Sequence, residues 1–424
     1  MSEVNFISTI IGIGILLFAA KVMAELFLRL KLPIVLGELL AGIIIGPYAL
    51  GGFFIYNGAS LVEITEEIKI LGQIGALVIL FMAGLQMAPK EFLKGGKAAF
   101  IVATGGVVAS FFVGFVVFQM FGFEALQSML IATALTATSI AITVQVLSEF
   151  GKIKTPQARL IIGAAVIDDI LAIAVLSVVL SIAGNGADAI QNIDIMKIIG
   201  TMLQVLGFFA IMLVVTVLVI PKFITPRLWK AKGGIEGIAT ASFFGAAGLA
   251  GLIGLSPIVG AFAVGMALSA GKIFEKIHNY IEKMGLIFAP LFFVIIGAQV
   301  DLRVVNLESI ALSGIIIAVA VVTKLGGCGL PAMYFLKSKT QGMRVGIGMI
   351  AKGEVSLIVA GVGISTGILT SNVYSTIVIM VAATTIITPI WLKIEYRREL
   401  RRYKSDENTS PSPSAENNKD MKVE

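Results

Sequence analysis

The chain has 424 residues, of which 57% are apolar and only 14% are charged. Its mean hydropathy is +0.98, whereas an ordinary soluble protein has roughly 25% charged residues. These values exclude a soluble enzyme and a disordered protein. The sequence contains one cysteine, Cys328, and one histidine, His278, which excludes an intrachain disulfide and a histidine-based metal site.

Apolar segments of membrane-spanning length follow one another through most of the chain. A spanning helix needs ~20 apolar residues, and the breaks between segments predict about thirteen spans. In chain order they cover residues 4–28, 33–50, 68–87, 98–120, 125–148, 158–183, 196–220, 234–254, 256–271, 281–300, 307–335, 342–365 and 371–392. The sequence therefore predicts an all-α membrane protein with about 13 transmembrane helices.

Basic residues flank these spans mainly on one side. The connections after odd-numbered spans hold 24 Lys and Arg residues, whereas the other side holds three, Lys69, Lys197 and Arg303. Cytoplasmic loops carry an excess of Lys and Arg. The pattern predicts an odd number of spans in a multi-pass protein of the cell membrane, with the N-terminus outside and the C-terminus in the cytoplasm.

Two pairs of similar sequence segments link spans that are seven apart in chain order. Residues 32–35 (LPIV) resemble residues 255–259 (LSPIV), and residues 80–86 resemble residues 293–299. Because seven is odd, the paired spans cross the membrane in opposite directions, which predicts inverted-topology repeats. Many secondary transporters have such repeats, with the binding site near the midplane where the repeats meet. Chance similarity between glycine-rich apolar helices is the alternative.

Charged side chains inside the predicted spans are candidates for a functional site, because a charge at mid-membrane costs at least ~2.5 kcal/mol. Asp168 and Asp169 lie near the middle of the sixth span, and Lys324 lies deep in the eleventh. A carboxylate there can hold a proton or a hard monovalent cation in turn, which is the competition that an antiporter needs. We expect an Asp168–Lys324 ion pair that opens when the cation binds. A purely structural ion pair is the alternative.

Two spans carry signs of an interrupted helix. The fifth contains Thr138 and Ser139 in a threonine-rich run, and such hydroxyls can satisfy freed backbone groups and donate oxygen ligands. Its repeat partner, the twelfth, contains two glycines followed by Lys352 and Glu354. Broken helices at equivalent positions point to a transporter site, where Lys352 and Glu354 would compensate the charges of half-helix ends. An unbroken threonine-rich helix is the alternative for the fifth span.

The Asp168-Asp169 pair, the Thr138-Ser139 segment, Lys324 and the run Lys352-Gly353-Glu354-Val355 together resemble the monovalent cation:proton antiporter-2 family. The resemblance covers essentially residues 4–396 and is strongest to sodium/proton antiporters without a soluble regulatory domain. It implies homodimers that work by elevator-like alternating access, with two broken crossing helices in a moving core and a separate dimerisation domain.

Carried onto this chain, the resemblance implies a role for each matching residue. Asp169 is the principal carboxylate for cation and proton, with sodium held at Asp169 and Asp168, and Thr138 and Ser139 form the broken helix beside them. Asp168 pairs with Lys324. Because electroneutral relatives carry Asn-Asp, the Asp-Asp pair implies electrogenic exchange. Position 352 is a departure, since the family most often has Arg there.

The expected transmembrane antiporter domain covers residues 1–396. Its core is expected at about 98–183 and 307–392, and its dimerisation scaffold at about 4–87 and 196–300. The polar segment 397–424 is expected to be a disordered cytoplasmic tail, too short for a nucleotide-binding domain.

The resulting hypothesis is a secondary active antiporter that exchanges cytoplasmic sodium, with lithium as a second cation, for external protons in pH homeostasis. Its partners would be the cation, protons, the lipid bilayer and a second copy of the chain, with no nucleic acid, no cofactor and no enzymatic activity. A potassium/proton antiporter of the same fold stays open, because the sequence does not show the filter radius. A di-aspartyl intramembrane protease is a distant alternative. That chemistry needs two acids facing each other from different helices, whereas Asp168 and Asp169 are adjacent on one helix.

Overall fold

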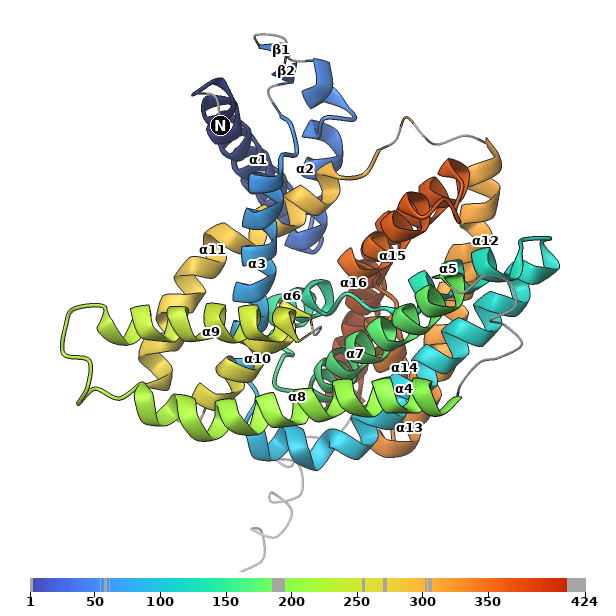
Figure 1. Ribbon diagram of the computed structural model, residues 1–424. Helices are drawn as coiled ribbons and strands as arrows, with labels where there is room; N and C mark the ends of the chain where they lie inside the picture. The colour runs from blue at the N-terminus through green and yellow to red at the C-terminus, as the bar shows by residue number, and fades with distance from the viewer. Residues whose placement is uncertain are drawn as a thin grey trace, which may run out of the picture.

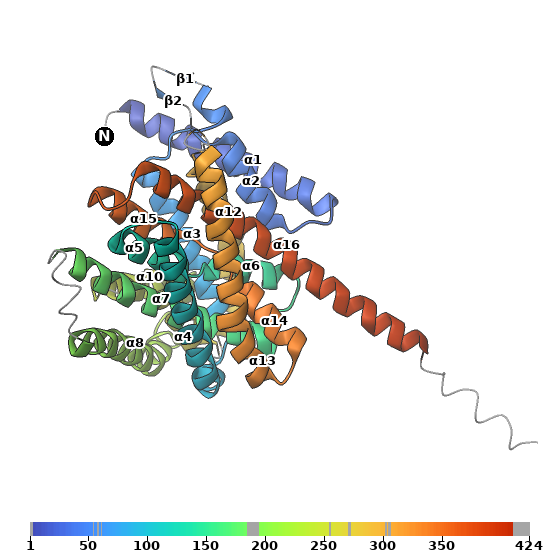
Figure 2. The same cartoon turned by 90° about the vertical axis from the view of Figure 1, so that its right-hand side faces the viewer.

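The computed structural model describes residues 3–53, 55–56, 59–60, 62–184, 195–253, 256–269, 273–301, 303 and 307–409. Most of them are helical (Figures 1 and 2). The helices in chain order are α1 (Glu3–Arg29), α2 (Ile34–Ile45), α3 (Glu66–Leu85), α4 (Pro89–Met120), α5 (Ala125–Thr136), α6 (Ile140–Glu149), α7 (Pro156–Gly184), α8 (Ile195–Phe223), α9 (Gly234–Leu252), α10 (Pro257–Leu268), α11 (Phe274–Ala298), α12 (Leu307–Lys324), α13 (Leu330–Leu336), α14 (Lys339–Gly348), α15 (Glu354–Ser365) and α16 (Ser371–Thr409). After α2 come a 3₁₀ turn, η1 (Leu50–Phe53), and two antiparallel two-residue strands, β1 (Ile55–Tyr56) and β2 (Ala59–Ser60).

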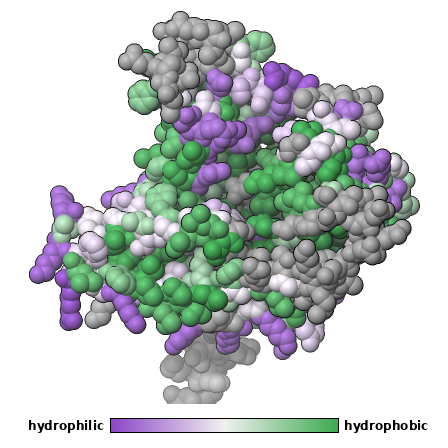
Figure 3. All heavy atoms as spheres, viewed as in Figure 1, coloured by the Kyte–Doolittle hydropathy of each residue, from purple (hydrophilic) through white to green (hydrophobic). Residues whose placement is uncertain are grey.

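The described helices have the length and composition of membrane spans. Ten of the helical stretches are long and apolar enough to cross a membrane. Large apolar side chains also face outward: Phe18 is 72% exposed and Leu252 is 84% exposed. Figure 3 shows apolar residues over a broad stretch of one face. An apolar surface of this kind is stable in contact with lipid rather than water. The chain is therefore a multi-pass, all-helical membrane protein.

The helices form two groups (Figure 1). In the first group, α3 packs against α10 and α11, α2 packs against α1 and α11, and α9 packs against α10. In the second group, α4 packs against α5 and α7, α12 packs against α4 and α16, and α15 packs against α5 and α16. The site described below lies where the two groups meet.

Glycines allow the closest helix contacts in the first group. Gly42 of α2 faces Gly297 of α11, and a Cβ on Gly42 would lie 2.0 Å from a backbone oxygen of α11. Gly84 of α3 faces Gly265 of α10, and a Cβ on Gly84 would lie 2.3 Å from a backbone oxygen of α10. Gly84 and Gly297 occupy equivalent positions of the similar segments 80–86 and 293–299, whereas Gly42 and Gly265 lie farther along the helices that begin at the other pair. The helices that are similar in sequence thus make similar glycine contacts.

The C-terminal helix is longer than the sequence indicated. We expected disorder from residue 397 onward, but α16 continues to Thr409, so this part of the prediction is wrong. The physical reason is that Arg, Glu and Lys are good helix formers, and an ion pair within the helix joins Arg398 to Glu395 at 2.9 Å. Figure 2 shows α16 projecting away from the bundle. Residues 410–424 lie outside the described residues, so the expectation of disorder there stays a prediction.

Candidate functional site

Asp168 and Asp169 lie in the middle of α7, and both side chains are buried, with 0% and 3% exposed. α7 packs against α4, α5, α6 and α14. Ile167 and Ile170, which flank the pair, are buried as well. Two adjacent carboxyl groups are therefore held in an apolar interior, where a charge is stable only with a partner.

Lys324 supplies that partner for Asp168. Its Nζ lies 2.9 Å from Oδ1 of Asp168, and both side chains are fully buried. Lys324 is thus the partner that the sequence led us to expect. The second oxygen, Oδ2 of Asp168, has no hydrogen-bond partner among the described residues. This carboxylate therefore retains an acceptor for a cation or a proton.

The backbone that follows Lys324 is irregular and packs closely against α4. α12 ends at Lys324, and the chain continues as a π-helical turn, η4 (Leu325–Gly329). Such turns are rare in proteins, and many of those that occur lie at functional sites. A Cβ on Gly106 of α4 would lie 2.3 Å from Sγ of Cys328 and 3.4 Å from Nζ of Lys324. A glycine at position 106 therefore leaves the space that Cys328 of η4 occupies, and α4 packs here against the side chain of Lys324.

Two helices are interrupted beside the aspartates, where the sequence indicated breaks. α5 ends at Thr136 and α6 begins at Ile140, while α14 ends at Gly348 and α15 begins at Glu354. Between the ends of each pair, the chain is extended or irregular and its backbone groups need other partners.

The two interruptions supply partners to each other. The backbone N–H of Ser139 donates to the carbonyl oxygen of Ala351 at 2.8 Å. The hydroxyl of Thr138 donates to the carbonyl oxygen of Met349 at 3.1 Å. Hydroxyl and backbone groups of one break thus satisfy the freed backbone groups of the other, which holds both breaks in one place.

Lys352 closes the open end of α5. Its fully buried Nζ donates a hydrogen bond to the carbonyl oxygen of Leu135, and the hydroxyl of Ser356 donates to the carbonyl oxygen of Ala134 at 2.7 Å. Both carbonyls belong to the last turn of α5, whose partial negative charge a cation stabilises. Glu354 is the first residue of α15. Its side chain lies outside the described part of the structure, so its role stays a prediction.

Asp169 lines a small pocket together with Thr138 and Ser139. Ile258 of α10 and Phe292 of α11 line its other side, so the pocket lies between the two helix groups. A carboxylate beside hydroxyl and backbone oxygens is a ligand set that suits a hard cation. The structure thus brings together Asp169 and the two hydroxyl residues singled out from the sequence.

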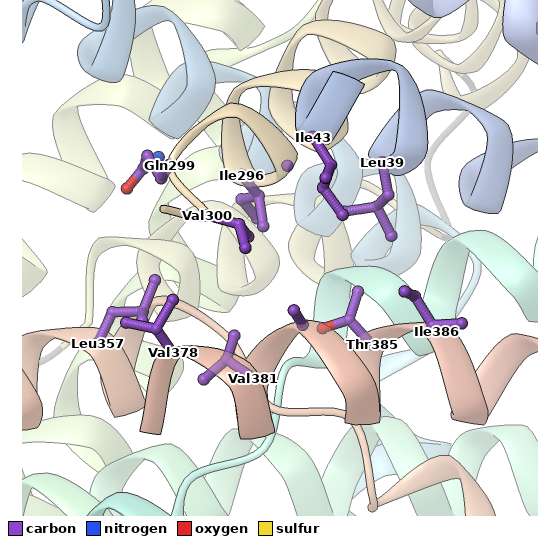
Figure 4. A pocket seen from close by; sticks show the side chains of 12 residues that line it. Leu39, Ile43, Ile296, Gln299, Val300, Leu357, Val378, Val381, Thr385 and Ile386 are labelled. Atoms are coloured by element: carbon purple, nitrogen blue, oxygen red, sulfur yellow. The ribbon is translucent and has the colours of Figure 1, made fainter. Parts of the chain in front are cut away.

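An apolar pocket lies on the same boundary between the helix groups (Figure 4). Leu39 of α2 and Ile296 of α11 lie on one side, and Val381 and Ile386 of α16 lie on the other. Apolar contacts of this kind carry no directional preference. The two groups therefore face each other here through surfaces that do not fix one relative position.

Several contacts near the site were not predicted from the sequence. The hydroxyl of Thr384 accepts a hydrogen bond from the backbone N–H of Lys352, and the hydroxyl of Thr385 donates to the backbone oxygen of Lys352. Paired threonines in an apolar span were a readable signal for this role. Glu149, at the end of α6, accepts hydrogen bonds from the two N–H groups that begin α2. That contact joins residues more than 110 positions apart, and no local pattern predicts it.

Buried acids beside two interrupted helices, in an all-helical membrane protein, define the class of secondary transporters. Comparison with known proteins gives the family within this class. The family model described as "Sodium/hydrogen exchanger, transmembrane" matches residues 14–395. The chain belongs to this family.

Individual relatives are similar over most of their length. The High-affinity Na(+)/H(+) antiporter NhaS3 of Synechocystis sp. is 32% identical, over 95% of this chain and 93% of that protein. The Na(+)/H(+)-K(+) antiporter GerN of Bacillus cereus is 32% identical, over 91% of this chain and 95% of that protein. Among solved structures, the sodium proton antiporter MjNhaP1 of Methanocaldococcus jannaschii aligns with a TM-score of 0.66 at 17% identity, over 97% of this chain and 100% of that one. The last similarity shows a shared fold.

Proposed function

We propose that the protein is a secondary active antiporter that exchanges cytoplasmic sodium for external protons across the cell membrane. The observation that carries this proposal is the pocket of Asp169, Thr138 and Ser139 between the helix groups, next to the buried Asp168–Lys324 ion pair. The names of similar proteins support it, since NhaS3 and the relative from Enterococcus hirae are both called Na(+)/H(+) antiporters. The proposed activity involves no enzymatic reaction and no cofactor.

Asp169 is the proposed carrier of both ions. A buried carboxylate can be neutralised either by a proton or by a cation, so the two exclude each other and their flows are coupled. Oxygens of Thr138 and Ser139 complete the ligand set for sodium. A cation that also reaches Oδ2 of Asp168 competes with the ammonium of Lys324 and opens the ion pair.

The proposed transport step is an elevator-like motion of a core, residues 98–183 and 307–392, against a scaffold, residues 4–87 and 196–300. The apolar boundary of Figure 4 supports this division, because its contacts can be exchanged without breaking hydrogen bonds. The scaffold would also form the contact between two copies in a homodimer.

We infer thirteen spans with inverted repeats. The contact of Gly42 with Gly297 and that of Gly84 with Gly265 exchange with each other under the seven-span offset. The interrupted helices α5–α6 and α14–α15 are related by the same offset. The distribution of Lys and Arg supports an outer N-terminus and a cytoplasmic C-terminus.

Exchange is proposed to be electrogenic, because two carboxylates and one ammonium give the site more than one exchangeable proton for each cation. A net charge moved in each cycle would then be driven by ~2.3 kcal/mol per 100 mV of membrane potential. Inward proton flow could therefore extrude sodium against its gradient.

The decisive experiment uses the purified chain in proteoliposomes. An imposed sodium gradient is expected to drive proton movement in the native protein and not in Asp169→Asn. The matched control is Asp301→Asn, in a loop beyond α11 where Asp301 pairs with Arg303, and it is expected to retain exchange. Full exchange by Asp169→Asn would contradict the assignment of the site.

Potassium is the second candidate cation, and the name of GerN, a Na(+)/H(+)-K(+) antiporter, favours testing it. The same liposome assay with sodium, lithium and potassium gradients decides between them. The intramembrane protease has no such support, since Asp168 and Asp169 are adjacent on one helix and Asp168 is paired with Lys324.

A further inference from the structure

A further pocket lies between the α1–α2 connection, the end of α6 and α16. Its cavity volume is ≈ 450 Å³, and it is partly open to the surroundings. Ligand pockets commonly have volumes of ~300–1,000 Å³. This pocket is therefore large enough for a molecular ligand, whereas the pocket beside Asp169 is small. We call it the basic pocket.

Four cations line the basic pocket: Lys31, Lys152, Lys393 and Arg397. The guanidinium of Arg397 donates to the backbone oxygen of Lys31 at 3.3 Å, and Nζ of Lys152 lies 5.9 Å from the centre of the Tyr396 ring. None of the four cationic side chains forms an ion pair with a described residue. Four cationic side chains therefore face one carboxylate, that of Glu149, and the pocket keeps an excess of positive charge.

The single carboxylate of the basic pocket, Glu149, is already engaged. Its two oxygens accept hydrogen bonds from the backbone N–H groups of Ile34 and Val35, at 3.0 and 3.2 Å. These N–H groups begin α2, where a negative charge is favoured. Glu149 balances one of the four positive charges at most, so the remaining excess is available to an anion from outside the chain.

The other wall of the basic pocket is apolar. Leu28, Leu32 and Pro33 line it at the α1–α2 connection, and Leu28 is 55% exposed. The pocket lies where apolar spans give way to basic connections, which is the level of lipid headgroups on the cytoplasmic side of the proposed orientation. Basic pockets between membrane helices at this level bind anionic headgroups.

We propose that the basic pocket binds an anionic phospholipid, with the headgroup phosphate on the four cations and an acyl chain along the apolar wall. A free phosphate or nucleotide would use the cations but would leave the apolar wall without a function. Residues of α6 and α16 line the pocket. Helix α6 begins directly after Ser139 of the proposed cation site. Lipid binding itself does not depend on the transport assignment.

Native mass spectrometry of the full chain, released from detergent with added phosphatidylglycerol, tests the proposal. We expect specific binding of phosphatidylglycerol over phosphatidylcholine. The variant Lys31→Gln/Lys152→Gln is expected to bind phosphatidylglycerol about thirtyfold more weakly, since each basic residue near an anionic surface contributes ~1 kcal/mol. Both positions lie outside the helices, so the fold is preserved. Adding Arg397→Gln should weaken binding further.

The matched control is Lys230→Gln/Lys232→Gln, which removes two exposed charges from the α8–α9 connection, on the side that also carries most basic residues. It is expected to bind phosphatidylglycerol like the native chain. Equal binding by the native chain, Lys31→Gln/Lys152→Gln and the control would overturn the proposal. The basic residues would then act only as orientation signals. The proposal also fails if inorganic phosphate at millimolar concentration displaces the lipid completely, because the apolar wall would then add nothing.

Discussion

The buried ammonium group of Lys352 donates a hydrogen bond to the carbonyl oxygen of Leu135. The cation of one interrupted helix thus binds a free carbonyl at the end of the other. The contact joins the two sequence segments on either side of the proposed transport site. Because the carbonyls of a helix end carry partial negative charge, this hydrogen bond stabilises the contact between the two breaks.

Replacing Lys352 with Met is therefore expected to lower stability and abolish exchange. Leu135 would be left with a buried carbonyl lacking its partner, at a cost of ~1–3 kcal/mol. Lys352→Arg keeps the charge and is expected to retain most of the exchange. Thermal unfolding and sodium-driven proton movement in proteoliposomes check both variants, and normal stability of Lys352→Met would contradict the assignment.

Breaking the Asp168–Lys324 ion pair is expected to destabilise the protein strongly. Asp168→Asn leaves the ammonium of Lys324 buried without its carboxylate, and one-sided removal of such a pair costs ~3–5 kcal/mol. The double variant Asp168→Asn/Lys324→Gln removes both charges and should unfold at a higher temperature than either single variant. Additive losses in the double variant would show that the two side chains do not depend on each other.

Removing the charge of Asp168 is also expected to abolish the transport current of any variant that stays folded. Solid-supported-membrane currents with sodium jumps at several pH values measure this. Persistent current from Asp168→Asn, with the sign of the native protein, would contradict a role of this carboxylate in electrogenic exchange.

Gly106→Ala is expected to impair exchange by displacing η4, the turn that directly follows Lys324. The added Cβ would lie 2.3 Å from Sγ of Cys328, and such overpacking costs ~1–3 kcal/mol. Cys328→Ala in the same chain removes the sulfur and should restore part of the stability. The control is Gly96→Ala, also in α4, where a Cβ meets nothing within 4 Å. Equal behaviour of the two alanine variants would contradict the steric argument.

Glu149→Gln is expected to change the maximal rate of exchange more than the KM for sodium. Glu149 lies outside the pocket of Asp169 but joins α6 to α2, so its removal affects the contact between the proposed core and scaffold. The loss of a negative charge at a helix start costs ~0.3–1 kcal/mol. A raised KM with an unchanged maximal rate would place Glu149 in the ion path instead.

The sequence predicted the parts of this structure that depend on local composition. Apolar length gave the membrane-spanning helices, and hydroxyl residues or glycines near position 138 and position 352 gave the two breaks. The pairing of Asp168 with Lys324 followed from the cost of burying either charge alone, since few opposite charges were available inside the spans.

Features that depend on contacts between distant segments could not be read in this way. The π-helical turn after Lys324 packs against α4, a segment about 220 positions earlier. The hydrogen bonds of Glu149 to the start of α2 require two helix ends that are far apart in sequence to meet in space. The extension of α16 to Thr409 was missed for a different reason. Polar, charged residues are compatible with disorder and with an exposed helix alike, and composition does not separate the two.

The glycine contacts of the first helix group have a mechanical consequence. With 2.0 Å between a hypothetical Cβ of Gly42 and a backbone oxygen of α11, the main chains of the two helices touch directly, and no side-chain cushion is left to deform. Neither this crossing nor that of Gly84 with Gly265 can slide without a steric collision. This half of the molecule is therefore tightly packed, and the proposed elevator-like motion would take place at the apolar boundary between the two helix groups.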